Sequence, residues 1–398
     1  MSRCKITKKK IPQIIDFGKM PIANGFLNKK DFKSEFFYNM GVSFSKDISL
    51  LQLNSHPRPE MMFNKNYPFF TSSSKFMIKH FNNYANWAKK NYVRKNITKI
   101  IEIGSNDGTF LKNFRKKNFK HLGFEPSKNV SEIAKINGIN SVTEFFNRKN
   151  LRGHENFVNK TDIIFGANVV CHIPDLVEFI LTCDLALNEN GKIIFEEPYL
   201  GSMYKKISYD QIYDEHIFMF SISSIKKIFD IFDFQLIDVL PQNTHGGSMR
   251  YVLKRKRSKL NKKIKKCLDI EKNENISNIT GALKFKKNCQ LSREKLQYKL
   301  NDIKKKGNLI CGYGATSKST TILNYCNIDS NIIDCIFDTT PNKIGKYSPG
   351  MHIPIIDYKI FKKKFYEYSF LFAWNHKKEI EQKEIRYLKN GGKWITHL

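Results

Sequence analysis

The feature that most constrains the fold of this chain is an alternation of apolar segments, glycine-bearing turns and helical segments. In the longer of two such series, the segments KIIEIG, HLGFEP, DIIFGANV, GKIIFEEP and FQLIDVLP have the length and apolar content of buried strands. Helices are expected between or after them, at 111–119, 128–137 and 223–232. Strands alternating with helices predict an α/β fold with a parallel, doubly wound sheet, which we assign to residues 63–245.

A shorter series of the same kind lies near the C-terminus. NLICGYGATSKSTTILNYC has the pattern of strand, glycine turn and helix, and the strand-like segments DCIFDTT, FLFAWN and KWITHL follow it. The series predicts a second, smaller Rossmann-like unit. Together with the segment before it, this unit is assigned to 246–398, and residues 1–62, whose strand-like pieces IPQIIDFG and SLLQLN are short and irregular, form a small N-terminal module.

The segment 254–306 joins the two series. It is highly charged, lacks proline, and carries Leu283, Leu291, Leu296 and Leu300 at helical spacing. This pattern predicts a helical connector. A nucleic-acid-binding coil is the alternative, and the scarcity of aromatic residues in the segment disfavours it.

Length and charge limit the class of protein. A chain of 398 residues can hold two or three domains, each with its own core. No apolar run approaches the roughly 18 to 20 residues of a membrane helix, and the basic N-terminus lacks the apolar stretch of a secretory signal, so a cytoplasmic enzyme is expected. The net charge of +31 favours anionic partners, but the lysines are spread along the whole chain, which indicates a bias of composition.

The turn after KIIEIG carries the first candidate binding residues. Gly104 allows a tight turn and a close approach of a ligand, and Glu102 stands at the end of the strand before it. About twenty residues further on, the next strand ends in Glu125, where a carboxylate suits the two hydroxyls of a ribose. The turn lacks the full GxGxxG of a dinucleotide site, but turn and acid together resemble motif I and the following acid of class I S-adenosylmethionine (SAM) methyltransferases. The alternative is a βαβ turn without a ligand.

Polar groups follow two later strands. Asn168 ends the strand DIIFGAN and leads to His172, and the motif QIYDEH at 211–216 combines a phenol, two carboxylates and an imidazole. In open α/β sheets ligands bind beyond the carboxyl ends of the strands, and these are the side chains that transfer protons. A surface position for His172 and a structural or metal-binding role for His216 are the alternatives.

Eleven segments then make a family resemblance specific. They are YPFFTSSS (67–74), EIGSNDGTF (102–110), GFEPS (123–127), ANVVCHIPD (167–175), EPYLG (197–201), QIYDEH (211–216), HGGSMRY (245–251), GYGATSKS (312–319), FDTTPNK (337–343), PGMHIPI (349–355) and FAWNH (372–376). In this order they resemble the SAM-dependent sugar C-methyltransferases of deoxysugar pathways. The pattern is most similar to the family branch that methylates C-3′ of a dTDP-linked 3-amino-4-keto sugar in tetronitrose biosynthesis.

The resemblance implies a role for each matching residue. The implied active-site residues are Tyr67, His172, Tyr213, Glu215 and His216, with His216 as the general base. The implied SAM-binding residues are Glu102, Gly104, Asn106, Asp107, Glu125, Pro126 and Asn168. The implied residues for the nucleotide sugar are His245, Gly246, Gly312, Tyr313, Gly314, Lys318 and Asn375.

The implied reaction is methylation of carbon next to a ketone. Carbon is a poor nucleophile, so we expect His216 to remove the C-3 proton of a nucleotide-linked 4-keto-deoxysugar while Tyr213 or His172 hydrogen-bonds the enolate oxygen. The nucleotide, dTDP or UDP, and the methylated carbon stay open, and so does the oligomeric state. The alternatives are an O- or N-methyltransferase acting on a nucleotide sugar, a nucleic-acid methyltransferase, for which no RNA-binding module is evident, and a non-enzymatic relative. Neither nucleic acid nor a membrane is expected as a partner.

The cysteines depart from the family pattern. Eight cysteines are present, without a CxxC pair or a cluster at zinc spacing, so reduced and mostly buried thiols are expected. The family's N-terminal module normally binds a structural zinc ion through two CxxC pairs. Here only Cys4 remains, and the other ligand positions hold Thr7, Ser45 and Ile48. Since isoleucine cannot bind zinc, the module is predicted to be metal-free, and no metal or redox cofactor is expected elsewhere.

Overall fold

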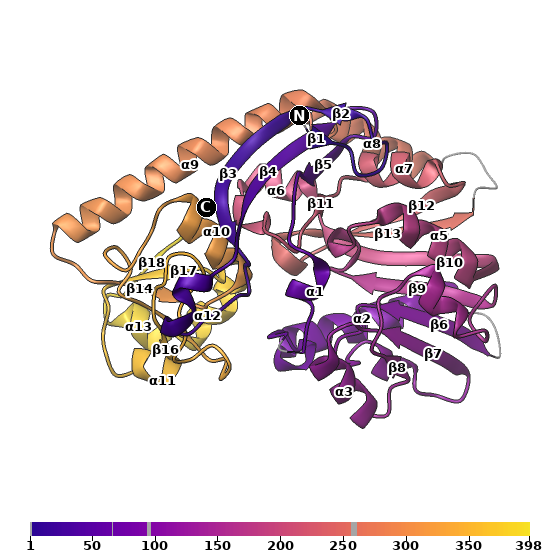
Figure 1. The fold of residues 1–398 in the computed structure, drawn as a ribbon, viewed down its shortest axis with the longest axis horizontal. Coiled ribbons are helices and arrows are strands. Elements are labelled where there is room, and N and C mark those ends of the chain that lie inside the picture. Colours follow the sequence, from indigo (N-terminus) through magenta and orange to yellow (C-terminus); the bar gives the residue numbers. More distant parts are fainter. Residues whose placement is uncertain (1, 66, 94–96, 256–260) are drawn as a thin grey trace.

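The computed structural model describes residues 2–65, 67–93, 97–255 and 261–398 and contains three main sheets (Figure 1). A four-stranded sheet holds the N-terminal strands, a seven-stranded sheet forms the central part, and a five-stranded sheet forms the C-terminal part. In Figure 1 the long strands of the N-terminal sheet pass between the two larger parts. The N-terminal module is therefore positioned to contact both of them.

The seven-stranded sheet has the order β12-β13-β10-β9-β6-β7-β8. Its strands are β6 (Thr98–Ile103), β7 (Phe119–Phe124), β8 (Ser141–Val142), β9 (Thr161–Ala167), β10 (Leu187–Pro198), β12 (Phe234–Gln242) and β13 (Ser248–Arg255). The strands from β10 to β8 are parallel to one another, as predicted. β13 is antiparallel to both of its neighbours. The short link from β12 allows only an antiparallel pair with that strand. This strand lies beyond the expected domain end at residue 245.

Helices cover this sheet where the sequence has an apolar stripe. They are α2 (Lys75–Tyr92), α3 (Lys128–Ile136), α4 (Arg148–Arg152), α5 (Leu176–Ala186) and α7 (Ile222–Asp230). The short helix α6 (Leu200–Lys206) packs instead in the core that the N-terminal strands share with the C-terminal part. The helix predicted at 111–119 is wrong beyond its first turn, since only the 3-10 helix η3 (Leu111–Phe114) forms. Residues 115–118 are charged or polar and exposed, so a longer helix would have no apolar face to bury.

The C-terminal sheet is parallel throughout, with the order β16-β15-β14-β17-β18. Its strands are β14 (Ile310–Tyr313), β15 (Cys335–Asp338), β16 (Ile355–Asp357), β17 (Tyr368–Leu371) and β18 (Lys393–Ile395), and its helices are α10 (Ser317–Tyr325), α11 (Tyr358–Phe361), α12 (Lys377–Lys383) and α13 (Ile385–Lys389). The predicted second Rossmann-like unit is therefore confirmed. The strand expected at FLFAWN ends at Leu371, and Trp374–His376 form the 3-10 helix η7.

The connector is helical, as predicted, and comprises α8 (Lys262–Asn273) and α9 (Ile279–Lys305). Its residues 256–260 lie outside the described part of the chain. Leu296 and Leu300 of α9 are buried, whereas Leu283 and Leu291 are half exposed. Within the described ranges, no helix has both the length and the hydropathy that crossing a membrane requires.

The N-terminal module is not a separate unit. Its strands β3 (Gln13–Pro21), β4 (Phe37–Ser45) and β5 (Leu50–Leu53) continue into β11 (Phe218–Met219), which comes from the central part of the chain. Near the short pair β1 (Ser2–Arg3) and β2 (Lys10–Ile11), Cys4 and Ile48 are buried in one apolar cluster. The backbone N–H of Thr7 donates to the Cys4 sulfur at 3.4 Å. Apolar packing thus fills the position where the family's zinc ion is expected, and the absence of metal stays a prediction.

Candidate active site

A cavity of about 940 Å³ lies between the seven-stranded sheet and the C-terminal sheet. Its lining residues follow the carboxyl ends of strands in both sheets: Asn168 follows β9, Thr316 follows β14 and Thr339 follows β15. Ligands bind at this edge of open α/β sheets. The cavity volume is at the upper end of the roughly 300–1,000 Å³ of small-molecule sites, so it has room for two ligands.

The loops of the central sheet are built for close approach to a ligand. Gly104 has φ +63°, and a Cβ atom there would come within 2.7 Å of Val169, so only glycine fits. Asn106 and Asn168, which both line the cavity, also have left-handed backbones, with φ +48° and +54°. Such non-glycine conformations cost about 1–3 kcal/mol each and gather at ligand sites.

Two buried carboxylates face this end of the cavity. Glu125 accepts the backbone N–H groups of Asn106 at 3.0 Å and Ser127 at 2.8 Å, which leaves lone pairs for further donors. Glu102 Oε2 is buried without a hydrogen-bond partner among the described residues. Burial, together with Asp107 and Glu125, raises the pKa of Glu102 well above its ordinary value. The donor and acceptor set fits a ligand that presents hydroxyl and ammonium groups.

Asp107, predicted to bind the cofactor, lies outside the cavity lining. Its carboxylate accepts the backbone N–H of Ser72 at 2.8 Å and the hydroxyl of Thr109 at 2.6 Å. Asn106 Oδ1 accepts the N–H of Thr71 at 2.9 Å. Asn106 and Asp107 therefore hold the 3-10 helix η2 (Thr71–Ser73) beside the site. In this structure Asp107 anchors that helix and does not line the cavity in which a ligand would bind.

The proton-transfer residues of QIYDEH are brought together, but His216 does not face the cavity. Tyr213 and Glu215 line it, and His216 lies behind Tyr213, whose hydroxyl is 2.7 Å from His216 Nε2. His216 Nδ1 lies 2.7 Å from the carbonyl oxygen of Gln211. Since a carbonyl oxygen only accepts, Nδ1 of His216 carries the hydrogen. Nε2 carries the lone pair, which accepts the hydrogen bond from the Tyr213 hydroxyl. The sequence prediction of an imidazole in direct contact with substrate is therefore corrected to one that reaches the cavity through a phenol.

Burial keeps both imidazoles of the site neutral. It lowers the pKa of His216 well below its ordinary value, with a further contribution from His172. Burial also lowers the pKa of His172 to about 3. The His172 ring lies between those of Phe63, at 5.7 Å, and His216, at 5.2 Å between centroids. Its Nε2 has no hydrogen-bond partner in the described part of the chain, so it is left for a ligand in the cavity.

Glu215 has a partner on each carboxyl oxygen. Oε1 accepts from the side-chain amide of Asn24 at 2.7 Å, and Oε2 lies 3.4 Å from the Tyr67 hydroxyl. Burial and the neighbouring Asp214 raise the pKa of Glu215 well above its ordinary value. A carboxyl group that keeps its proton can donate a hydrogen bond into the cavity.

Cys171, His172 and His216 form a group that could hold a metal ion, with ligand atoms within 4.8 Å of one another. Two features oppose this role. Burial and Glu197 raise the pKa of the Cys171 thiol well above its ordinary value, whereas zinc binds the thiolate. Both ring nitrogens of His216 are already hydrogen-bonded. The predicted absence of a metal stays a prediction.

The C-terminal part contributes cationic and polar groups to the cavity. Lys318, near the start of α10, donates to Asn375 at 3.3 Å, and its ammonium lies 5.0 Å from the centre of the Trp374 ring. Burial lowers the pKa of Lys318. His245 also lines the cavity, with φ +50°, and comes from the link between β12 and β13 of the seven-stranded sheet. Three of the predicted substrate residues, Lys318, Asn375 and His245, therefore line the cavity.

Four other predicted substrate residues lie outside the cavity lining. The Tyr313 hydroxyl donates to Glu384 at 2.8 Å, and its ring packs in the core of the C-terminal sheet. A Cβ atom on Gly312 would meet Phe372 at 2.8 Å, and Gly314, with φ +87°, shapes the turn after β14. Gly246 packs against Trp374, which would be 2.2 Å from an added Cβ. Within the motif GYGATSKS, Gly314 lies at the turn, and Lys318 is the predicted residue that lines the cavity.

Several lining residues were missed at the sequence level. They are Asn24, Phe63, Phe145, Phe146, Asn147, Ser317 and Lys343. Phe145–Asn147 follow β8, a strand of two residues that is too short to give a periodic signal. Asn24 lies in the N-terminal module, and nothing in its local sequence indicates contact with the active site.

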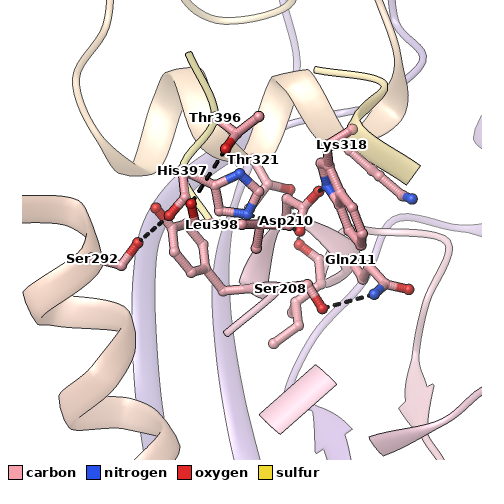
Figure 2. A network of polar contacts seen from close by, with 12 residues as sticks. Ser208, Asp210, Gln211, Ser292, Lys318, Thr321, Thr396, His397 and Leu398 are labelled. Atoms are coloured by element: carbon pink, nitrogen blue, oxygen red, sulfur yellow. Dashed lines mark hydrogen bonds and ion pairs between the residues drawn. The ribbon is translucent and has the colours of Figure 1, made fainter. Parts of the chain in front are cut away.

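Behind the cavity wall, a buried network joins the C-terminus to the catalytic loop (Figure 2). Asp210 accepts from the indole N–H of Trp374 at 2.6 Å and pairs with His397 at 3.1 Å. Ser292 of α9 donates to the carbonyl of His397 at 2.8 Å. Burial opposes ionisation of Asp210, but His397 and Lys318 hold its pKa below the ordinary value. The next residue, Gln211, supplies the carbonyl that orients His216.

The sequence matches two known families in succession. The family described as "Methyltransferase domain" matches residues 71–239, and the family described as "C-methyltransferase C-terminal domain" matches residues 243–398. Over 386 residues, the chain is 25% identical to the C-methyltransferase NovU from Streptomyces niveus, covering 96% of this chain and 92% of NovU.

Solved methyltransferase structures are similar to part of the chain. One is a SAM dependent methyltransferase from Aquifex aeolicus, with 14% identity and a TM-score of 0.34, covering 46% of this chain and 98% of that one. Another is magnesium protoporphyrin IX methyltransferase from Synechocystis PCC 6803 with bound SAM, with 12% identity and a TM-score of 0.34, covering 45% and 79%.

Proposed function

Since this chain is a methyltransferase, in which a class I methyltransferase domain is followed by a C-methyltransferase C-terminal domain, we propose that it transfers the methyl group of SAM to a carbon of a nucleotide-linked 4-keto-deoxysugar, at C-3. The observation that carries this proposal is the neutral His216, bonded through Tyr213 to a cavity that also holds Glu215. A base and an acid side by side suit removal of a proton next to a carbonyl.

The central-sheet end of the cavity is the proposed SAM site. Glu125 keeps free lone pairs for ribose hydroxyls, and Glu102 Oε2 and Asn168 Oδ1 are buried acceptors without partners among the described residues. The tight turn at Gly104 leaves room for the ligand beside them. When bound, SAM supplies an electrophilic methyl carbon.

The C-terminal wall is the proposed site for the nucleotide diphosphate. Lys318 and Lys343 line the cavity together with Thr316 and Ser317, at the start of α10. Cations and the N-terminal N–H groups of a helix attract phosphate. Burial lowers the pKa of both lysines, and a bound diphosphate would stabilise their charged forms. These groups do not distinguish one nucleobase or one sugar from another. The choice between dTDP and UDP is therefore left to experiment.

The proposed base is the Tyr213–His216 pair. The phenol oxygen takes the proton from the sugar carbon while its own proton passes to His216 Nε2, and the electron pair of the C–H bond becomes available to form the new C–C bond. A free phenolate is unfavourable, because burial and Glu215 raise the pKa of Tyr213 well above its ordinary value. Transfer to the neutral imidazole avoids forming one.

The proposed acid is Glu215. As the enolate forms, negative charge develops on the ketone oxygen, and a neutral carboxyl in a buried site can donate a hydrogen bond to it. His172 Nε2 and the Tyr67 hydroxyl line the same region and are additional partners for the oxygen. One oxyanion donor typically contributes about 10²–10³-fold in rate.

Methylation of oxygen or nitrogen on a nucleotide sugar is the second candidate. It requires a base but no enolate, and the Tyr213–His216 pair would serve it equally well. Glu215 distinguishes the two reactions, since a protonated carboxyl has a defined task only where a carbonyl oxygen becomes negative.

The experiment is incubation of the protein with SAM and a panel of dTDP- and UDP-linked 4-keto-6-deoxysugars, with the corresponding 4-hydroxy sugars as controls. Only the keto sugars should gain the mass of one methyl group. When the reaction is run in D₂O, deuterium that the sugar has taken up from solvent should be lost from the carbon that becomes methylated. Methylation of the 4-hydroxy sugars instead would favour the second candidate. No methylation of any sugar in the panel would overturn the substrate assignment.

A further inference from the structure

We propose that Asn24, supplied by the N-terminal module, is a positioning residue of the active site that fixes which oxygen of Glu215 faces the reaction. This inference rests on the function proposed above. Asn24 follows β3 and lines the cavity, although the sequence pattern predicts no candidate site residue in the N-terminal module.

The side chain of Asn24 connects the two walls of the cavity. Its amide nitrogen donates to Glu215 Oε1 at 2.7 Å, and its oxygen accepts from the hydroxyl of Ser317 at 3.1 Å. Glu215 belongs to the central part of the chain and Ser317 to α10 of the C-terminal part. Because Ser317 occupies the amide oxygen, the amide nitrogen is the atom that meets Glu215.

The backbone beside Asn24 is held from the same two sides. The N–H of Ala23 donates to Asp214 Oδ2 at 3.0 Å, and its carbonyl accepts from the hydroxyl of Thr320 at 2.8 Å. Ala23 is buried. With its neighbour clamped in this way, Asn24 has little freedom to turn from Glu215, as a preorganised site requires.

The contact determines where the proton of Glu215 lies. The amide nitrogen of Asn24 only donates, so Oε1 must accept from it, and the hydrogen of a neutral carboxyl resides on Oε2, whose neighbour, the Tyr67 hydroxyl, can accept as well as donate. Oε2 is the oxygen near Tyr67, which lines the cavity as Glu215 does. Without Asn24 either oxygen could carry the hydrogen, and the acid would be aimed at the substrate only part of the time.

Other titratable groups face Glu215 and must be considered. Asp214 adjoins it, Tyr67 contacts it, and Tyr213 and Cys171 interact with it electrostatically. Asp214 raises the pKa of Glu215, and the Asn24 and Tyr67 hydrogen bonds lower it, in support of the geometry. Removing the Asn24 amide should therefore raise that pKa and move the alkaline limb of the pH–rate profile to higher pH.

The test compares the full-length protein with the variants Asn24→Ala and Asn24→Asp, and with Asn39→Ala, an exposed asparagine on β4 of the same module, as the control. Steady-state rates are measured across pH with the keto sugar that the wild type methylates, and SAM affinity and thermal unfolding are measured in parallel. Asn24→Ala should lower kcat about 2- to 10-fold, the value of a hydrogen bond between neutral groups, with a smaller change in KM.

Asn24→Asp places a third carboxyl group beside Glu215 and Asp214. The like charge of the new carboxylate should raise the pKa of Glu215 further. The alkaline limb of the pH–rate profile of Asn24→Asp should therefore lie at higher pH than that of Asn24→Ala. A lower kcat with an unmoved pH limb in both variants would indicate a structural role only and overturn the proposal. Unchanged kcat would also overturn it.

A second readout does not depend on activity. Infrared difference spectra of the carboxyl C=O stretch, taken across pH, report the protonation of buried carboxyl groups, and Glu215→Gln identifies the band of Glu215. In Asn24→Ala that band should shift and persist to higher pH. If the wild type methylates no keto sugar but the band responds as expected, the proposed function fails and the positioning role holds. A band that Asn24→Ala leaves unchanged refutes the positioning role.

Discussion

Replacement of Tyr213 by phenylalanine tests the proposed proton path most directly. The change removes one oxygen atom, which lies 2.7 Å from His216 Nε2, and keeps the ring that lies 4.0 Å from the imidazole between centroids. The change affects both the stability of the protein and its turnover, and these two effects differ enough in size to be separated.

The effect on stability should be small. His216 Nε2 would be left buried without its partner, which costs about 1–3 kcal/mol. The effect on turnover should be large, since loss of a group that carries the proton lowers the rate about 10²–10⁴-fold. Tyr213→Phe is therefore expected to fold and to bind SAM like the wild type, with kcat reduced by at least two orders of magnitude.

The assay is exchange of substrate hydrogen with D₂O in the absence of SAM, followed by single-turnover methylation. The control is Tyr209→Phe, which removes a buried hydroxyl that contacts the Cys326 sulfur at 3.5 Å, away from the cavity. It should exchange and methylate at the wild-type rate. If Tyr213→Phe exchanges within about threefold of the control, His216 reaches the substrate without the phenol and the proposed path is wrong.

Three further predictions concern the groups around this path. His216→Asn should retain SAM affinity and lose about 10²–10⁴-fold in kcat; a near wild-type rate would exclude it as the base. His397→Ala breaks the buried pair with Asp210 and should destabilise the protein by about 3–5 kcal/mol in urea unfolding, whereas a change below about 1 kcal/mol would show that Trp374 and Lys318 suffice. Burial raises the pKa of Asp214, so the folded protein keeps a proton that the unfolded chain releases above pH 4, and stability falls as pH rises through that window. Asp214→Asn removes this titration and should flatten the decline between about pH 4 and pH 7, and parallel declines in both proteins would contradict the assignment.

The sequence by itself predicted the sheets and the places where ligands gather. Strand periodicity and the turns after KIIEIG and NLICGYG fixed two α/β units, because the apolar pattern of a buried parallel strand is local. The acid Glu125 and the motif QIYDEH were also found, since chemistry-bearing residues after a strand are visible in one dimension.

The tertiary structure alone decided which of these side chains reach the cavity. Tyr313 packs in the core of the C-terminal sheet, and Asp107 binds the backbone of Ser72, although both residues stand in motifs at strand ends. His216 lies behind Tyr213. Asn24, which contacts Glu215, lies in the N-terminal module, 191 positions earlier in the chain. Side-chain direction and long-range contact depend on how the three parts pack against one another, and no local pattern in the sequence records that packing.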